Sequence, residues 1–188
     1  MALIPYADEN SQDERVRKLV ARLPEPRINL FTMLANAPVL AGPTLRLGEA
    51  ILTRSDLSYE LRELVILHTA RLTGTEYEWV QHEQIARLLG IDEAKLRAVE
   101  LGQLDQGGLS HVELISLELV ERLLRDGTPP PQLVTEVAAA LGHSQLIELL
   151  LVAGYYAMLG GMMRAVQLDI DNVLEKGMLD RERLAGES

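Results

Sequence analysis

Two carboxylates and one imidazole on neighbouring predicted helices are the side chains in this sequence best suited to acid–base chemistry. Glu78 and His82 are four residues apart, so on a helix they share one face, with Cβ atoms about 6 Å apart. That face continues through the apolar residues Ile85, Ala86 and Leu89. A polar pair on an apolar stripe must be satisfied by a partner or used for chemistry. Glu63, on the preceding predicted helix, can converge on the same place.

Such a group of ionisable side chains could supply both a proton donor and a proton acceptor near neutral pH. In a partly desolvated pocket, the two carboxylates and the imidazole shift one another's pKa values. Glu63, Glu78 and His82 are therefore the predicted catalytic residues. Tyr77 and Trp79 lie close to these residues in the sequence, and each has a large apolar ring system with one hydrogen-bonding group. Together with Thr75 they are the predicted substrate-binding residues.

A purely structural interpretation of the same residues stays open. Thr75-x-x-Glu78 is also a capping-box pattern, in which Thr75 caps the helix and Glu78 reaches back to the Thr75 amide. His82 would then be an ordinary buried histidine bonded to a carbonyl group. The spacing alone does not separate the two interpretations.

Composition bounds what these side chains can do. The chain has 188 residues, 47% of them hydrophobic and 4% aromatic, which predicts one domain with an aliphatic core. A net charge of -10 argues against a nucleic-acid or anionic-membrane partner. With no cysteine, disulfides, zinc–thiolate sites and thiol nucleophiles are excluded. We predict neither a metal site nor a cofactor, and the absence of a signal-peptide pattern predicts a cytoplasmic protein.

No run alternates with period two for long enough to predict a strand, so the expected fold class is all-α. Ser11, Ser58, Asp92, Ser110 and Ser144 are expected helix N-caps. Short or long helices are expected over residues 11–23, 28–37, 39–52, 59–73, 75–90, 92–101, 110–127, 129–142 and 144–163. The predicted organisation is an N-terminal arm and first helix in residues 1–26, a helical domain in 27–178 and a flexible tail in 179–188.

The last predicted helix is apolar on nearly all sides between Leu146 and Met163. Its length would allow a membrane span. Glu148 within the run and Gly160-Gly161 near its end argue against that interpretation. We expect instead a core helix that also faces another subunit.

Two motifs in order resemble a known family. They are Arg62-Glu63-Leu64-x-Ile66-Leu67 and then Tyr77-Glu78-Trp79-x-x-His82-x-x-x-Ala86-x-x-x-Gly90. They resemble the carboxymuconolactone decarboxylase family, within the alkylhydroperoxidase D-like superfamily. The likeness extends over about residues 25–175, because Gln145-Leu-Ile-Glu148 and Gly154-Tyr-Tyr156 resemble the C-terminal helix of longer members. The resemblance implies an all-α, alkylhydroperoxidase D-like helical bundle that forms a homo-oligomer, often a trimer or hexamer.

The resemblance also implies which chemistry is lost. In the peroxidase branch the motif is a Glu, then Cys-x-x-Cys-x-x-x-His. Carried over, the acid falls on Glu63 and the histidine on His82, while the two cysteine positions hold Thr75 and Glu78. Neither a hydroxyl nor a carboxylate can cycle through a disulfide. Thiol peroxidase chemistry is therefore excluded, even though a family-level peroxidase label would still apply.

The leading hypothesis is a cofactor-free acid–base lyase that acts on a small carboxylated lactone or a related aromatic-degradation intermediate. His82 would donate or relay the proton, and Glu63 or Glu78 would set its tautomer. Arg62 and Arg71 are candidates to bind a carboxylate, although we favour exposed surface positions for both. His68 is expected in the core, and His111 and His143 on the surface.

Two alternatives stay open. One is a non-catalytic oligomer of the same fold that binds a small molecule or acts as a scaffold. The other is a purely structural hydrogen-bond network that joins the two helices. A solvent-reachable cavity lined by Glu63, Glu78 and His82 would separate catalysis from both alternatives.

Overall fold

The computed structural model describes residues 1–25 and 27–171, and these residues contain helices and no strand. The predicted all-α class is confirmed. The predicted tail in residues 179–188, and the end of the predicted domain at residue 178, lie outside the described residues. The helices are α1 (Glu14–Val20), α2 (Asn29–Leu34), α3 (Pro38–Arg54), α4 (Tyr59–Thr73), α5 (Glu76–Leu89), α6 (Glu93–Leu101), the short 3₁₀ helix η1 (Leu104–Gln106), α7 (His111–Asp126) and α8 (Pro131–Val166).

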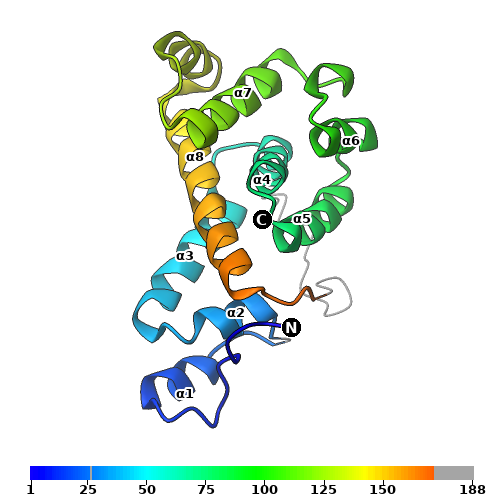
Figure 1. The fold of residues 1–188 in the computed structure, drawn as a ribbon. Helices are drawn as coiled ribbons and strands as arrows, with labels where there is room; N and C mark the ends of the chain where they lie inside the picture. The colour runs from blue at the N-terminus through cyan, green and yellow to red at the C-terminus, as the bar shows by residue number, and fades with distance from the viewer. Residues whose placement is uncertain (26, 172–188) are drawn as a thin grey trace.

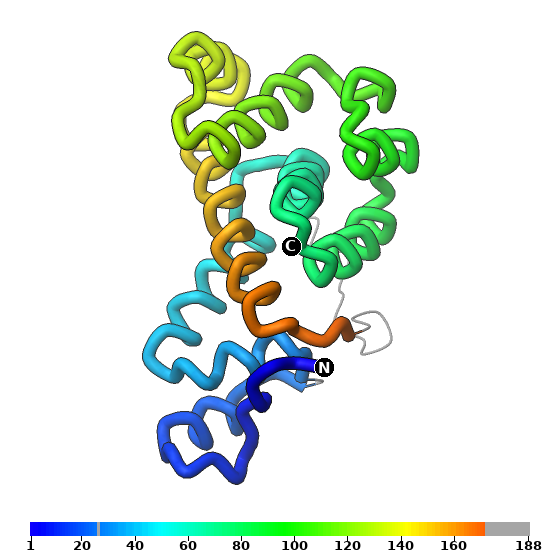
Figure 2. Tube along the Cα trace, viewed as in Figure 1, coloured from blue at the N-terminus to red at the C-terminus, as the bar shows by residue number. Residues whose placement is uncertain are grey.

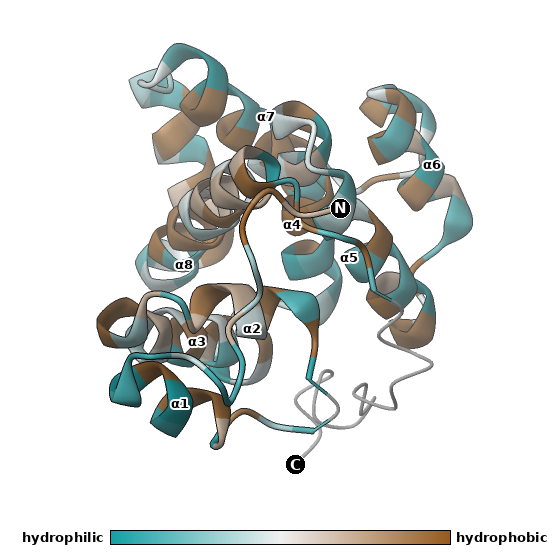
Figure 3. Cartoon of the chain, turned by 60° about the horizontal axis from the view of Figure 1, so that its bottom comes forward, coloured by the Kyte–Doolittle hydropathy of each residue, from teal (hydrophilic) through white to brown (hydrophobic). Residues whose placement is uncertain are grey.

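Helix α4 is the centre of the fold. Figure 1 shows it enclosed by α5, α6, α7 and α8, and α4 packs against each of these four helices. Every residue from 61 to 70 is buried. Figure 3 shows that α5 and α6 carry both hydrophobic and hydrophilic residues, the pattern of helices with one face toward a core. Any polar side chain on α4 must therefore find its partners inside the protein.

Local capping explains why α4 ends where α5 can begin. Ser58 caps α4, its Oγ accepting a hydrogen bond from the Leu61 amide at 3.2 Å. At the other end, Gly74 adopts the left-handed conformation with φ of 70°, which costs glycine little. Only Gly74 and Thr75 separate the two helices. The short connection makes α4 and α5 direct neighbours and brings their side chains together.

Several predicted helix starts are confirmed and others are wrong. Asp92 caps α6, and Ser110 with Glu113 forms the predicted capping box of α7. The predicted cap at Ser11 is wrong, because Asp13 caps α1 instead by accepting from the Arg15 amide. Ser11 accepts from the Asp13 amide, so it supports the turn that precedes the helix.

Two early helices differ in length from the prediction. Helix α2 is shorter than the predicted 28–37, whereas α3 is longer than the predicted 39–52. Pro38 occupies the first position of α3, where its missing N–H costs nothing. Pro43 lies inside α3 near its start, and the helix continues through it.

Helix α8 forms the long side of the molecule (Figure 1). Gly142 has φ of 82° and ψ of 166°, so the helical path is kinked there, at the predicted break. This break does not end the element, which runs on to Val166. By length and composition α8 could cross a membrane, but half of its most apolar stretch is buried inside the protein. It packs against α4 and α7.

The N-terminal residues pack onto the rest of the fold. The Leu3 amide donates to the Val166 carbonyl at 2.8 Å, so the start of the chain lies beside the end of α8 (Figure 2). A small separate cluster joins α1 to α2 and contains Val16, Val20, Leu23 and Ala35. The predicted domain boundary between residues 26 and 27 stays a prediction.

Candidate functional site

Glu63 and His82 meet in the interior between α4 and α5. His82 Nδ1 lies 2.7 Å from Glu63 Oε2, and the Glu63 side chain is completely buried. The other carboxylate oxygen, Oε1, accepts a hydrogen bond from Arg62 Nε at 3.2 Å. A carboxylate next to Nδ1 makes that nitrogen the hydrogen-bond donor and leaves Nε2 for other chemistry. Of the two acids left open by the sequence, Glu63 is the one that orients His82.

The rest of the His82 ring is held by an aromatic side chain from α8. Tyr156 packs edge-on against it, with ring centroids 4.9 Å apart and an interplanar angle of 89°. The side chain of His82 is 9% exposed. Its Nε2 has no hydrogen-bond partner among the described residues and is not one of the fully buried polar atoms. The site therefore holds an almost completely buried imidazole whose Nε2 makes no hydrogen bond to another described residue.

Arg62 is not the surface residue that we expected. It is 3% exposed, because α4 is covered by other helices and its residues from Leu61 to Ala70 are buried. Its Nε donates a hydrogen bond to Glu63 Oε1. Arg71, the second candidate, is partly exposed, and its Nη2 lies 4.0 Å from Glu121 Oε2.

Glu78 enters the interior but forms no part of the Glu63–His82 pair. It is 1% exposed, and neither carboxylate oxygen has a hydrogen-bond partner among the described residues. Burial raises the pKa of Glu78 to about 8, opposed in part by the charge of Arg164. A carboxyl group with that pKa holds its proton at neutral pH. The expected convergence of both acids on His82 is thus found for Glu63 only.

The capping box at the start of α5 is not formed. Thr75 is the N-cap residue, yet its side chain makes no capping hydrogen bond. Its Oγ1 lies 2.8 Å from Thr73 Oγ1 instead. Glu78 points inward rather than back to the Thr75 amide. The local pattern in the sequence is therefore overridden by packing.

A glycine on α8 leaves room for the Glu78 carboxyl. A Cβ added at Gly160 would lie 3.0 Å from Glu78 Oε2 and closer still to Thr75 Oγ1. The backbone of α8 therefore contacts the first turn of α5 directly. Sequence reasoning missed Tyr156, Gly160 and Arg164 as neighbours of the site. In the sequence, Gly154-Tyr-Tyr156 carries only a resemblance to the C-terminal helix of longer family members.

The remaining predicted binding residues surround the first turn of α5 without pointing at His82. The Tyr77 hydroxyl donates to Asp171 Oδ2 at 2.7 Å, and Tyr77 itself is buried. Trp79 and Thr75 line one surface hollow of about 350 Å³, together with Arg71. Thr75 and Tyr77 line a second hollow of about 450 Å³. Glu63, Glu78 and His82 line neither of these two hollows.

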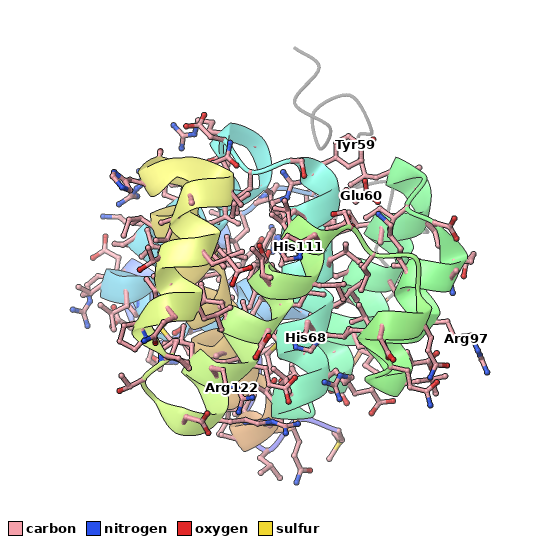
Figure 4. All side chains as sticks on the ribbon, turned by 90° about the horizontal axis from the view of Figure 1, so that it is seen from above. Tyr59, Glu60, His68, Arg97, His111 and Arg122 are labelled. Carbon is pink, nitrogen blue, oxygen red and sulfur yellow. The ribbon has the colours of Figure 1, made fainter. Side chains whose placement is uncertain are left out.

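The other histidines lie as expected with one difference. His111 and His143 are exposed, and His111 pairs with Glu136 at 3.2 Å. His68 lies on α4 beneath α7 (Figure 4) and is completely buried. Its nearest acid is Glu121, 3.5 Å from Nε2, so it is less well satisfied than expected. Burial, with help from Arg71 and Arg125, lowers the pKa of His68 to about 3.

No group of three or more His, Asp or Glu side chains in residues 1–25 and 27–171 is arranged to hold a metal ion. The acid–imidazole pair itself offers one free nitrogen, which alone makes a poor metal site. What the arrangement can do is hold an imidazole in a fixed tautomer and keep a neutral carboxyl group nearby.

Comparisons with known proteins agree with this architecture. Residues 38–113 match the model of the carboxymuconolactone decarboxylase family. The predicted family resemblance is confirmed. The matched family segment contains Glu63, Glu78 and His82.

The fold is also that of a solved structure. The alkylhydroperoxidase AhpD core, an uncharacterized peroxidase-related protein from Ralstonia eutropha JMP134, is similar with a TM-score of 0.75. The alignment covers 95% of this chain and 97% of that chain at 12% sequence identity. At that identity the likeness shows the fold alone. No curated protein matches the chain.

Proposed function

We propose that this chain is a cofactor-free acid–base lyase that removes carbon dioxide from a small carboxylated lactone or a related ring-derived acid. The observation that carries the proposal is the buried Arg62–Glu63–His82 series, which ends in an unpartnered Nε2. The family match of residues 38–113 supports the reaction class. Since the chain has no cysteine, thiol-dependent peroxide reduction is not open to it.

The proposed role of His82 follows from its hydrogen bond. Glu63 accepts from Nδ1 and stabilises the imidazolium form, in which Nε2 also carries a proton. When the bond between the ring carbon and the carboxylate breaks, its electron pair stays on the substrate and delocalises toward the lactone carbonyl. Nε2 then delivers its proton to carbon, carbon dioxide departs, and solvent reprotonates the imidazole. Positioned proton transfer of this kind typically contributes about 10²–10⁴-fold to a rate.

Exchange of His82 for glutamine tests the proposal. Gln keeps a polar side chain of similar reach but cannot donate a proton in this way. We expect carbon dioxide release from a panel of small carboxylated lactones to fall about 100-fold or more. His143→Gln is the matched control, because His143 is exposed and should keep full activity. Turnover by His82→Gln equal to that of the control would refute the role of His82.

One observation favours a second candidate, a purely structural network. The Arg62–Glu63–His82 series is almost completely buried, and the two hollows near α5 do not reach it. On that view the network only joins α4 to α5. His82→Gln would then lower the melting temperature strongly, and no acid in the panel would be turned over by the unmodified protein.

We further propose that the protein self-associates through α8. Its exposed apolar side chains Ile147, Leu151 and Met158 are 53–56% exposed and follow one face, with the exposed Gly154 between them. The spacing of four, three and four residues is that of a helix–helix seam. No charge lies on this seam although the chain carries -10. A second copy can therefore pack there without like-charge repulsion.

A charge placed in the seam tests this association. We expect Leu151→Glu to lower the molar mass measured by light scattering after gel filtration. Leu101→Glu, at a 50% exposed leucine on α6, should leave the mass unchanged. A monomeric unmodified protein, or one that partitions into lipid vesicles, would contradict the seam between copies.

A further inference from the structure

The hydrogen bond to Glu63 fixes only one atom of the His82 ring. Glu63 Oε2 lies 2.7 Å from Nδ1, and a single bond of this kind does not by itself fix the plane of the ring. A group that transfers a proton must be held within about 0.5 Å and 10–20° of its working geometry. A misplacement of about 1 Å can cost about 100-fold in rate. A second contact is therefore needed to set the direction in which Nε2 points.

Tyr156 of α8 makes that second contact. Its ring stands perpendicular to the imidazole, with centroids 4.9 Å apart and an interplanar angle of 89°. Perpendicular aromatic pairs at this separation are favourable beyond the area that they bury. Tyr156 is 4% exposed, so close packing leaves its ring little room to move. The imidazole is thus held from α4 by Glu63 and from α8 by Tyr156.

Tyr156 is itself held by the residue that precedes it. Tyr155 packs against it in another perpendicular contact, with centroids 5.2 Å apart and an interplanar angle of 83°. The Tyr155 hydroxyl donates to the Thr44 carbonyl of α3 at 3.1 Å. A Cβ at Gly48 would overlap that hydroxyl, so the missing side chain at Gly48 makes room for it. The two tyrosines therefore connect α3 to the ring of His82.

The Tyr156 hydroxyl lies among charged groups but carries no charge at neutral pH. Burial, together with the negative charge of Glu63, raises the pKa of this hydroxyl well above its usual range. The charges of Glu78 and Arg62 act on the same hydroxyl. Because it keeps its proton, Tyr156 contacts the imidazole without adding a negative charge that would compete with Glu63 for His82.

We propose that the Tyr155–Tyr156 pair positions the His82 imidazole, with Tyr156 fixing the ring and Tyr155 fixing Tyr156. The inference rests on the proposed function, in which His82 Nε2 delivers the proton, and it names the residues that set the direction of that nitrogen. Neither tyrosine has to contact the substrate in this role. Both belong to α8, whereas Glu63 and His82 belong to α4 and α5. The direction of Nε2 therefore depends on how α8 packs against these two helices.

Exchange of the His82 Nδ1 proton with solvent tests the assignment without a substrate. Nuclear magnetic resonance of the full chain measures this rate, with the His82 signal identified by its loss in His82→Gln. We expect Tyr156→Leu to speed exchange about two- to tenfold, because an imidazole without its aromatic contact opens from Glu63 more often. Tyr156→Phe, which keeps the ring, should restore the slow rate.

Carbon dioxide release gives a second readout, which separates the direction of Nε2 from substrate binding. Tyr156→Leu should lower kcat about tenfold or more, since the proton donor is misplaced. KM should stay within about twofold, because the tyrosine makes no contact that binds the substrate. A rise in KM with kcat unchanged would contradict a positioning role.

The matched control for lost core volume is Leu119→Ala. Leu119 is completely buried on α7, which packs against α4 and α8, so this variant loses stability but keeps the ring on His82. It should exchange the Nδ1 proton at the unmodified rate. Equal exchange rates in Tyr156→Leu and Leu119→Ala would overturn the assignment.

A second variant keeps the test decisive if Tyr156→Leu does not fold. Tyr155→Leu removes the ring behind Tyr156 and should speed exchange relative to Leu119→Ala. A rate equal to that of Leu119→Ala would overturn the assignment here as well. These rates are measured without substrate, so they are distinct from failure of the lyase proposal, which is decided by carbon dioxide release from His82→Gln.

Discussion

Two buried carboxyl side chains on adjoining helices differ in almost every respect other than burial. Glu63, in the middle of α4, contacts Arg62 and His82 and is 0% exposed. Glu78, in the first turn of α5, is 1% exposed and has no hydrogen-bond partner among the described residues. Both belong to the family segment, residues 38–113. The same residue type therefore occupies two opposite electrostatic environments.

The difference shows that one fold can place two glutamates in very different environments. Glu63 lies within hydrogen-bond distance of both Arg62 and His82, so it is suited to orient the imidazole ring. Burial without partners favours the neutral acid, so the pKa of Glu78 rises to about 8. Two carboxyl groups in such different environments are typical of acid–base sites.

The largest expected effect comes from neutralising each acid in turn. Glu63→Gln removes the buried partner of both Arg62 and His82 and should cost about 3–5 kcal/mol in the free energy of unfolding. Glu78→Gln replaces a carboxyl group that must take up a proton on folding at pH 7 by an amide that need not, so it should not lower the free energy of unfolding at that pH. Urea unfolding of both variants measures the contrast. An equal loss in the two would show that the environments of the acids are alike.

The second effect is the pH dependence that Glu78 confers. Its folded-state pKa is about 8 and its ordinary value is 4.5, so between these values the folded state binds more protons than the unfolded chain. The contribution is complete below pH 4.5 and is lost as pH rises through 8. We expect the unmodified protein to lose a few kcal/mol relative to Glu78→Gln across this interval.

The buried His68 also contributes a pH dependence to the stability of the fold. His68, with a pKa lowered to about 3 from 6.5, stabilises the fold above pH 6.5 and loses that contribution as pH falls. Urea midpoints compared between about pH 6.5 and about pH 9 avoid this interval. Parallel pH profiles for the unmodified protein and Glu78→Gln would contradict a raised pKa for Glu78.

The smallest effect concerns the close approach that shelters Glu78. Gly160→Ala would drive a Cβ against Glu78 and Thr75 and should cost about 1–3 kcal/mol. Gly161→Ala is the matched control, because nothing lies within 4 Å of its Cβ position. It should gain up to about 1 kcal/mol from the better helix propensity of alanine. Thermal unfolding of Gly160→Ala and Gly161→Ala measures the difference in stability. If Gly160→Ala is as stable as the unmodified protein, α8 does not confine Glu78.

Some of the site could be predicted from sequence because its signals are local or periodic. Glu63 lies on a helix with apolar residues on two sides, and His82 lies on the buried stripe of the next one. A Gly74 stop between them leaves little choice about how those helices pack. The burial of Arg62 could not be predicted in this way. Its side chain is buried because four other helices cover α4, and that arrangement is a property of the tertiary structure.

By itself the sequence determined the all-α class, the α4–α5 pair and the loss of thiol chemistry, because caps, apolar periodicity and the absence of cysteine are properties of the chain alone. Only the tertiary structure decided that Glu63 is the acid that orients His82 and that the capping box at the start of α5 does not form. It also decided that Arg164 of α8 lies near the turn before α5. The physical reason is that a local hydrogen bond such as a cap contributes about 1 kcal/mol. Packing between helices far apart in the chain can override a contribution of that size.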